Sequence, residues 1–493
     1  MCIRDSCRWI WRRRCRPDRA ASAEMTNPTV TVPLRHRLVQ WVVSQAWLRA
    51  IYRLVPAALR NRVTGRLMAP PEPVYCRFEN EGRWEQRRRA VPDAPVHFFG
   101  QADPAWAGHG VNVFAYLRGQ FGLAECARLY SRALLGARYP AALVDVDINL
   151  PHGWNDRSLD AYISDAAPHR VHLVFINPDF LDAALEQIGK ARLEGGYIIA
   201  CWFWELENIP STWLPALHQV DEVLVASRYV GEAFARVTDK PILCVPLPLS
   251  DVGDSGLQRE DFGIAPGDFV FLTSFDFNSY VHRKNPFAAI QAFQQAFPAG
   301  RKGVQLLIKT SNGYRRPDRL QLLLDAVSGD PRIVVRDQVL DRADVQALQR
   351  CADVYVSLHH AEGFGLGLAE CMAQGKPVIG TGWSGNMEFM DASNSALVDY
   401  TLVPVMEGEY AHHEGQRWAA ANVADAARWM RRLADEPQLA LAMGERARES
   451  VLQTLSPERA ASTLISRIEQ IHQQRRLIST PSIAPPSRQE GPN

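Results

Sequence analysis

The stretch that most constrains the fold is residues 353–390, DVYVSLHHAEGFGLGLAECMAQGKPVIGTGWSGNMEFM. Its first apolar run, residues 353–358, predicts a buried strand. A loop with three glycines at alternate positions follows, and residues 366–374 then show helical spacing up to Gly375, a residue suited to the left-handed conformation that ends a helix. A second apolar run, residues 378–380, comes after a Lys-Pro break. A strand, a glycine loop, a helix and a strand in this order predict one parallel unit of an α/β sheet, in which ligands bind at the carboxyl ends of the strands.

Two glutamates flank this glycine loop. Glu362 lies in the loop, and Glu370 lies eight positions later, inside the predicted helix. Free backbone N–H groups at a helix start suit phosphate oxygens, whereas carboxylates accept hydrogen bonds from sugar hydroxyls. A nucleotide sugar carries both kinds of group, so the pair predicts such a ligand. Two ordinary surface acids at a helix start would give the same pattern, and the pair alone leaves both interpretations open.

The run EGFGLGLAECMAQGKPVIGTGWSGNMEFM resembles the signature of the retaining glycosyltransferases of family 4, whose hallmark is Glu, seven residues, Glu. The resemblance is ungapped over this run and extends over roughly residues 96–475. It implies that Glu362 contacts the donor hexose and that Glu370 contacts the ribose. It also implies that the backbone between them holds the sugar and the diphosphate, at Gly363, Phe364, Gly365 and Leu366. A second glycine loop is expected to close over the donor, with Ser384, Gly385 and Asn386.

The same family binds the donor diphosphate with a lysine and, usually, an arginine about six residues before it. Lys284 matches the lysine, but Asn278 stands at the arginine position, and Arg283 is the candidate substitute. Both basic residues come just before a predicted helix, whose dipole favours an anion. The resemblance therefore predicts that Lys284, Arg283 and backbone N–H groups stabilise the charge on the departing diphosphate. Glu362, at the donor hexose, is the third candidate catalytic residue. The alternative is that the two cations are a solvated surface pair.

Apolar runs predict a further parallel sheet in the first half of the chain. These runs are residues 141–146, 171–176, 196–203, 221–226 and 242–247. An earlier strand leads into a glycine loop in which Gly119 and Gly122 are candidates for contact with the donor phosphates or the acceptor; its spacing is not a dinucleotide fingerprint. Glu205 belongs to a Trp-Glu segment that resembles a cleft-facing segment of a mannosyltransferase-like subgroup of the same family. It is a candidate for orienting an acceptor hydroxyl, and a rim acid bonded to backbone is the alternative.

The sequence does not favour a metal site. Asp145 and Asp147 form an Asp-x-Asp pair, but outside the context in which another glycosyltransferase fold uses it, and the adjacent His359 and His360 point to opposite faces of an extended segment. The nine cysteines contain no C-x-x-C pair. We therefore expect no metal and no other cofactor, with the nucleotide sugar acting as substrate.

The basic charge is concentrated at the N-terminus. The whole chain has a formal net charge of +1, which argues against nucleic-acid binding, yet residues 1–69 hold fourteen arginines and only three acids. In residues 34–68, leucines and tryptophans recur at helical spacing between arginines, as in a helix that lies on an anionic membrane surface; packing against the protein body is the alternative. Residues 1–24 are either an artefact of start-site choice or a basic arm. No run of eighteen apolar residues occurs, so we predict a cytoplasmic protein, at most peripheral at the inner face of the cell membrane.

Together these patterns and the resemblance predict an α/β protein of the GT-B fold, with two doubly wound Rossmann-like domains facing across a cleft and a basic helical N-terminal extension. The expected divisions are 1–95 (extension and linker), 96–248 (acceptor-side domain), 249–455 (nucleotide-sugar-binding domain), 456–477 (crossover helix) and 478–493 (disordered tail). The expected function is transfer of a hexose, with GDP-mannose favoured as donor, to a saccharide or lipid-linked acceptor in cell-surface polysaccharide synthesis. The alternatives are a non-catalytic nucleotide-sugar-binding protein and an epimerase or phosphorylase of the same fold.

Overall fold

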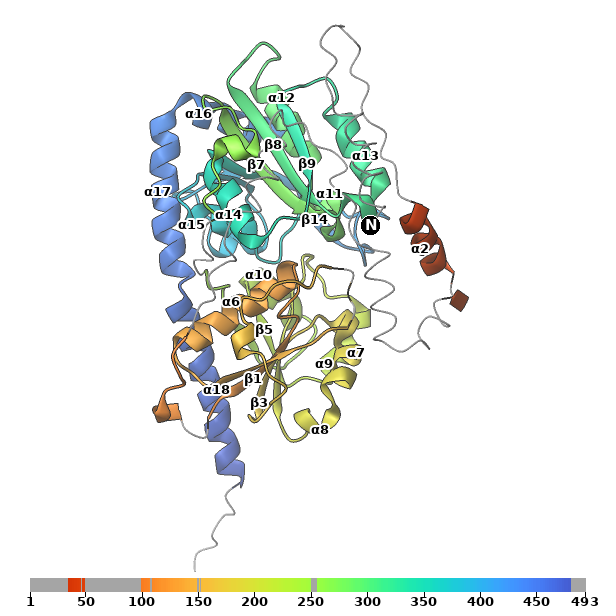
Figure 1. Cartoon of the computed structure of the whole chain (residues 1–493), viewed down its shortest axis with the longest axis vertical. Coiled ribbons are helices and arrows are strands. Elements are labelled where there is room, and N and C mark those ends of the chain that lie inside the picture. Colours follow the sequence, from red (N-terminus) through yellow and green to blue (C-terminus); the bar gives the residue numbers. More distant parts are fainter. Residues whose placement is uncertain are drawn as a thin grey trace, which may run out of the picture.

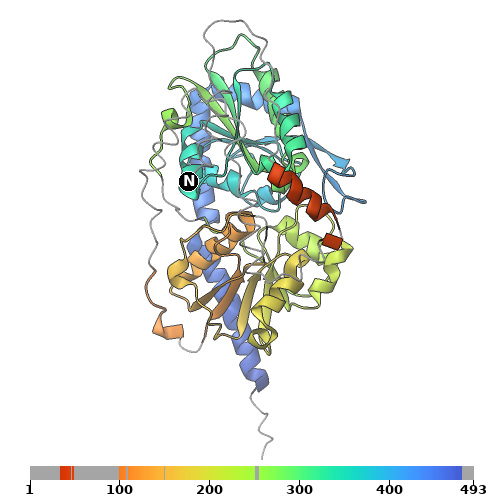
Figure 2. The ribbon, with the colours of Figure 1, turned by 45° about the vertical axis from the view of Figure 1, so that its right-hand side comes forward.

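The computed structural model describes residues 34–45, 47, 48, 99–106, 109–148, 150, 152–249 and 255–479. Two parallel six-stranded sheets, each with its own helices, lie one above the other, and a long helical segment runs along both (Figures 1 and 2). The predicted arm of residues 1–24 lies outside the described residues, as do residues 480–493 of the predicted tail.

The first sheet has the strand order β2-β1-β3-β4-β5-β6, and all its pairings are parallel. Its strands are β1 (Val111–Ala115), β2 (Ala141–Asp145), β3 (Val171–Phe175), β4 (Tyr197–Cys201), β5 (Glu222–Val225) and β6 (Ile242–Cys244). Its helices are α6 (Gly122–Gly136), α7 (Pro178–Ile188), α8 (Lys190–Leu193), α9 (Leu214–Leu217) and α10 (Arg228–Ala235). Each apolar run in the sequence contains one of these strands, because a parallel sheet covered on both faces needs apolar side chains on both.

The second sheet has the order β12-β11-β10-β7-β8-β9 and is also parallel throughout. Its strands are β7 (Phe269–Asp276), β8 (Val304–Ser311), β9 (Ile333–Asp337), β10 (Val354–Ser357), β11 (Val378–Thr381) and β12 (Ala396–Val398). Its helices are α11 (Val281–Lys284), α12 (Pro286–Ala296), α13 (Pro317–Ala326), α14 (Arg342–Cys351), α15 (Leu366–Ala373), α16 (Val423–Asp435) and α17 (Pro437–Thr454).

The stretch of residues 353–390 folds as predicted, into β10, a glycine loop, α15 and β11. Gly375 ends this helix with a φ of +73°. An antiparallel pair, β13 (Tyr400–Pro404) and β14 (Arg417–Ala421), was not predicted. The segment between its strands reaches the first domain, as described below.

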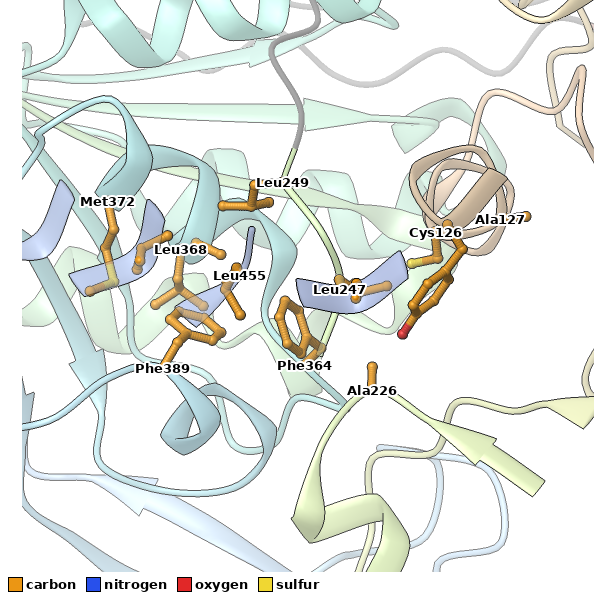
Figure 3. Close-up of a cluster of buried hydrophobic side chains, with 14 of the residues drawn as sticks. Cys126, Ala127, Ala226, Leu247, Leu249, Phe364, Leu368, Met372, Phe389 and Leu455 are labelled. Carbon is orange, nitrogen blue, oxygen red and sulfur yellow. The ribbon is translucent and has the colours of Figure 1, made fainter. Parts of the chain in front are cut away.

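The last described helix, α18 (Pro457–Ser479), returns to the first domain and packs along α6. Arg467 forms a 2.7 Å ion pair with Glu222, and the Tyr139 hydroxyl donates a 2.6 Å hydrogen bond to Glu469. One apolar core also continues between the two domains (Figure 3): Leu247 and Leu249 lie in the segment that joins them, and residues of both domains pack around it, among them Cys126 and Phe364. One hydrophobic core therefore joins the two domains.

Helix α2 (Leu34–Ser44) lies in the predicted N-terminal extension. Its Leu34 is 83% exposed and its Leu38 58% exposed, so these side chains are not buried against the protein body. No helix of the described residues combines the length and the apolar character needed to cross a membrane.

Candidate functional site

The glycine loop after β10 is held by the second glycine loop, which follows β11. The backbone N–H of Glu362 donates a 2.9 Å hydrogen bond to Ser384 Oγ, and the N–H of Gly385 donates a 2.8 Å bond to the Glu362 carbonyl. A Cβ on Gly385 would lie 2.2 Å from the carbonyl oxygen of Gly363, so only glycine fits there. The structure thus brings Ser384 and Gly385 together with the Glu362 loop, and it shows them supporting that loop.

The Glu362 carboxylate is buried between two cations. It forms an ion pair with Lys284 Nζ, and its Oε2 lies 3.0 Å from Arg283 Nη1. Burial alone would raise the pKa of Glu362, but the charges of Lys284 and Arg283 outweigh it and lower the pKa to about 2. Burial also lowers the pKa of Lys284, against the pull of Glu362. The carboxylate is therefore ionised at neutral pH and acts as a hydrogen-bond acceptor.

Arg283 lies between two carboxylates of different domains. In addition to Glu362, its guanidinium is 3.6 Å from Glu205 of the first domain, and it donates a 2.9 Å bond to the Ala361 carbonyl. Glu205 in turn accepts a 2.6 Å hydrogen bond from the hydroxyl of Tyr410, which lies between β13 and β14. The Arg283 side chain is only 5% exposed, whereas that of Lys284 is 21% exposed. Arg283 thus orients Glu362, and Lys284 is the more accessible cation.

Glu370 lies inside α15 and has partners of its own. Arg342, the first residue of α14, binds both of its carboxylate oxygens, and Gln349 Nε2 donates a 3.1 Å bond to Oε2. The other side of Arg342 faces the first domain, where its Nε is 3.6 Å from Glu125 in α6. Glu125 also pairs with Arg128 at 2.7 Å, so a buried chain of alternating charges joins Glu370 to the first domain.

The remaining residues expected around the donor differ in their surroundings. Phe364 is buried, with its ring 5.1 Å from that of Phe389, and Leu366 is half-buried at the start of α15. Gly365 has a φ of +93°, a conformation that favours glycine. Asn386 is fully buried and bonds His359 Nε2 and the Thr381 carbonyl, each at 3.0 Å, so its side chain is engaged inside the protein.

The two glycines of the first domain have different environments. A Cβ on Gly119 would lie 2.5 Å from the ring of Phe121, and the Gly119 carbonyl accepts a 2.7 Å bond from Arg128. Gly122, the first residue of α6, is exposed with open space around it. Among the described residues, no contact joins either glycine directly to Glu362, Lys284 and Arg283, which we call the Glu362 cluster.

Among the described residues, no group of three or more His, Cys, Asp or Glu side chains is arranged to hold a metal ion. Asp145 pairs with Arg118 at 3.4 Å, His359 bonds Ser357 and Asn386, and His360 packs on the ring of Trp418. Independence from metal stays a prediction.

Sequence reasoning missed Arg342, Gln349 and Tyr410. Their partners lie 28, 21 and 205 positions away along the chain, and each pairing depends on how elements pack in three dimensions. A basic residue opening the helix after β9 was visible in the sequence, but nothing there tied it to Glu370.

Comparison with solved structures identifies the architecture. The sucrose-phosphate synthase from Thermosynechococcus elongatus aligns with a TM-score of 0.54 and 16% identity, over 75% of this chain and 100% of that one. Anabaena HepE, solved in complex with UDP and glucose, aligns with a TM-score of 0.53 and 14% identity, over 73% of this chain and 100% of that one. The fold is GT-B. The pneumococcal O-GlcNAc transferase GtfA aligns with a TM-score of 0.44 and 15% identity, over 61% of this chain and only 57% of its own length.

Residues 273–474 match the family described as Family 4 Glycosyltransferase in conflict systems. The match includes the Glu362 cluster and Glu370 and most of the second domain, but less than half of the chain. A search of curated proteins gave no match. The family match and the GT-B fold together support a glycosyltransferase similar to those of family 4.

Proposed function

We propose that this GT-B protein is a retaining glycosyltransferase that moves a hexose from a nucleoside diphosphate sugar to a saccharide or lipid-linked acceptor. The observation that carries this proposal is the buried Glu362 carboxylate, paired with Lys284 and Arg283 where the two domains meet. Glu370 lies eight residues further on, inside the helix that follows the same glycine loop.

The chemistry follows from these groups. The departing diphosphate carries developing negative charge, which Lys284 and the free N–H groups at the start of α15 are suited to stabilise. Glu362 accepts hydrogen bonds from hexose hydroxyls, and Glu370 accepts them from the ribose. We assign Arg283 to holding Glu362 in place, because its donors are already engaged by protein oxygens. A front-face route, in which the leaving phosphate takes the acceptor proton, needs no side-chain nucleophile. Lys284 and the backbone N–H groups at the start of α15 would take the place of a bound metal.

We propose GDP-mannose as the donor, on the strength of the resemblance to a mannosyltransferase-like subgroup of family 4. The acceptor would be an intermediate in the synthesis of a cell-surface polysaccharide, and the enzyme would act on it from the cytoplasm. UDP-linked sugars are the donors to compare with it.

The test is a donor screen with the full chain. Nucleotide release is followed from GDP-mannose, UDP-glucose, UDP-GlcNAc and UDP-galactose with EDTA present. We expect slow hydrolysis of one donor, lost in Glu362→Gln and Lys284→Ala and retained in Lys302→Ala, which removes an exposed lysine elsewhere. Tight binding without turnover would favour a non-catalytic nucleotide-sugar-binding protein, and products other than a free sugar and nucleotide would favour an epimerase or phosphorylase. If no donor is bound and none is hydrolysed, the proposal is contradicted.

We also propose that α2 brings the enzyme to an anionic membrane surface. Leu34, Leu38 and Trp41 are spaced along one side of this helix and are each more than half exposed. Arg35 and Arg37 are exposed beside them, and no acidic residue occurs between Glu24 and Glu72. Exposed apolar side chains flanked by arginines match the chemistry of an anionic lipid surface.

A further inference from the structure

Four aromatic side chains gather where β1 and β2 end in the first domain. Tyr116 follows β1, Phe121 precedes α6, and His152 and Trp154 lie in the segment after β2. The rings of Phe121 and His152 are stacked, with centroids 4.3 Å apart and planes 24° apart. Trp154 meets Phe121 edge-on at 6.2 Å, and Tyr116 contacts both of them, at 5.5 Å and 6.0 Å. Phe121, His152 and Trp154 remain partly exposed, and we call these three the aromatic wall.

The backbone around the aromatic wall is fixed. Phe121 lies over Gly119, where any side chain would collide with its ring. The N–H of Gln120 donates a 2.8 Å hydrogen bond to the Gly153 carbonyl, which ties the two segments together. Trp154 Nε1 donates a 3.3 Å bond to the Leu150 carbonyl. The three rings are therefore held in place before any ligand arrives.

Tyr116 supplies a second and independent sign of a ligand. Its side chain is 1% exposed, yet its hydroxyl has no hydrogen-bond partner among the described residues. Leaving a buried hydroxyl without a partner is unfavourable, so such groups are rare unless something else satisfies them. A polar ligand atom at the aromatic wall would do so.

The aromatic wall faces the second domain. Burial lowers the pKa of His152, and two charges of the second domain also act on it: Asp276, the last residue of β7, raises the pKa, and Arg315, which follows β8, lowers it. Asp276 also opens the segment that leads to Arg283 and Lys284. The wall therefore lies on the side of the first domain turned toward the elements that carry the candidate catalytic residues.

We propose that the aromatic wall is the acceptor subsite and that it takes a pyranose ring of a saccharide. A sugar ring has a C–H face that packs on aromatic rings and hydroxyls that need partners, and the unpartnered Tyr116 hydroxyl, Asp276 and Arg315 are polar groups of the kind that would meet them. This inference rests on the proposed glycosyltransferase function. It deepens that function, because it makes a sugar ring, and not a lipid chain, the part of the acceptor that is recognised.

The test measures saccharide binding directly and does not depend on turnover. Saturation-transfer NMR on the full chain uses the methyl glycosides of mannose, glucose, galactose and N-acetylglucosamine as probes. We expect at least one to bind the wild type, and Phe121→Ala and Trp154→Ala to weaken it about two- to twelvefold, as loss of an aromatic contact of about 0.5–1.5 kcal/mol implies. Trp154→Phe should restore most of the binding. The matched control is Phe180→Ala, which removes a 44% exposed ring on α7.

Nucleotide affinity and donor hydrolysis, measured on the same proteins, separate the two proposals. Saccharide binding that depends on the wall, without hydrolysis of any donor, would retain the subsite and reject the transferase. Hydrolysis of a donor, with saccharide binding absent or equal in wild type and wall variants, would retain the transferase and overturn the subsite. If an alanine variant unfolds, as judged by its melting temperature, His152→Gln and Trp154→Phe supply the comparison, because each retains a side chain of similar size.

Discussion

Ser227 of the first domain donates a 2.7 Å hydrogen bond from Oγ to the carbonyl oxygen of Gly363 in the second. Both residues lie in buried backbone, and Ser227 also caps α10 by accepting from the N–H of Val230. Gly363 directly follows Glu362, so the loop that carries the candidate catalytic carboxylate is bonded to the first domain. A change in the spacing of the domains would move this loop, which links the geometry of the site to the contact between the domains.

The first prediction concerns the space at Gly363. A Cβ there would lie 2.8 Å from the carbonyl oxygen of Trp204, which is backbone of the first domain. Because backbone cannot rotate away as a side chain can, Gly363→Ala should destabilise the protein by about 1–3 kcal/mol and reduce donor hydrolysis. Thermal unfolding and the donor screen measure both effects. Gly267→Ala, at a glycine with open space around it, is the control; equal melting temperatures for the two variants would show that the domains do not meet as closely as observed.

The second prediction concerns the ion pair of Glu370 with Arg342. Glu370→Gln should weaken binding of the free nucleotide roughly 10- to 150-fold, as loss of about 1.5–3 kcal/mol of charged hydrogen bonding implies. It should also lower stability, because a buried Arg342 loses its charged partner. Isothermal calorimetry with GDP and UDP, together with thermal unfolding, separates the two losses.

The double variant Glu370→Gln with Arg342→Met isolates the ribose contact from folding. Removing both charges should recover much of the melting temperature, while nucleotide affinity stays low. Glu445→Gln, at an exposed position, is the control for the loss of a carboxylate. Nucleotide affinity unchanged in Glu370→Gln would remove the assignment of this residue to the ribose.

Most of the fold could be predicted from the sequence, because parallel strands buried on both faces leave continuous apolar runs such as residues 171–176. The pair β13 and β14 was missed: its strands have five residues each, and β13 is mostly exposed, so neither leaves the continuous buried apolar run of a parallel strand. Its position matters, since the segment between these strands carries Tyr410 to Glu205.

The candidate site was predictable only in part. Glu362 and Glu370 could be named because they flank a glycine loop at a strand end, and Lys284 because it matches the lysine that the family uses for the diphosphate. The side chain of Asn386 is buried and bonds His359, a partner that the sequence did not indicate, and its contact with the donor stays a prediction. The ion pair of Arg342 with Glu125 could not be predicted, because it forms only where α14 and α6 meet across the two domains. No local sequence pattern indicates that contact.

The third prediction is a loss of stability in acid. The pKa values of Glu362 and Glu125 are both lowered to about 2, in each case because neighbouring cations outweigh burial. Between about pH 2 and the ordinary value near 4.5, the unfolded chain therefore binds more protons than the folded one, so stability rises with pH. The stabilisation is complete above about pH 4.5 and is lost as the pH falls through about 2.

Thermal unfolding between about pH 7 and pH 3 measures this loss. The melting temperature should fall below about pH 4.5, and it should fall less steeply in Glu125→Gln and Glu362→Gln, which cannot titrate at those positions. Glu445→Gln should follow the wild type, because this side chain is exposed. Parallel acid profiles for all four proteins would mean that other groups cause the acid sensitivity.

The last prediction concerns the apolar side chains of α2. Leu34 and Leu38 lie four positions apart, on one side of the helix, with exposed fractions of 83% and 58%. Replacing both by serine removes apolar area that would enter a lipid interface, at roughly 1 kcal/mol or more for each leucine, and should weaken binding to vesicles containing phosphatidylserine by at least about tenfold. Sedimentation with such vesicles measures this, and higher salt should weaken wild-type binding further, because arginine attraction to anionic lipid is screened. Leu441→Ser, at a 58% exposed leucine on α17, should bind as the wild type does. Equal binding of the double variant and the wild type, or equal binding to vesicles of phosphatidylcholine alone, would show that α2 does not dock on an anionic membrane.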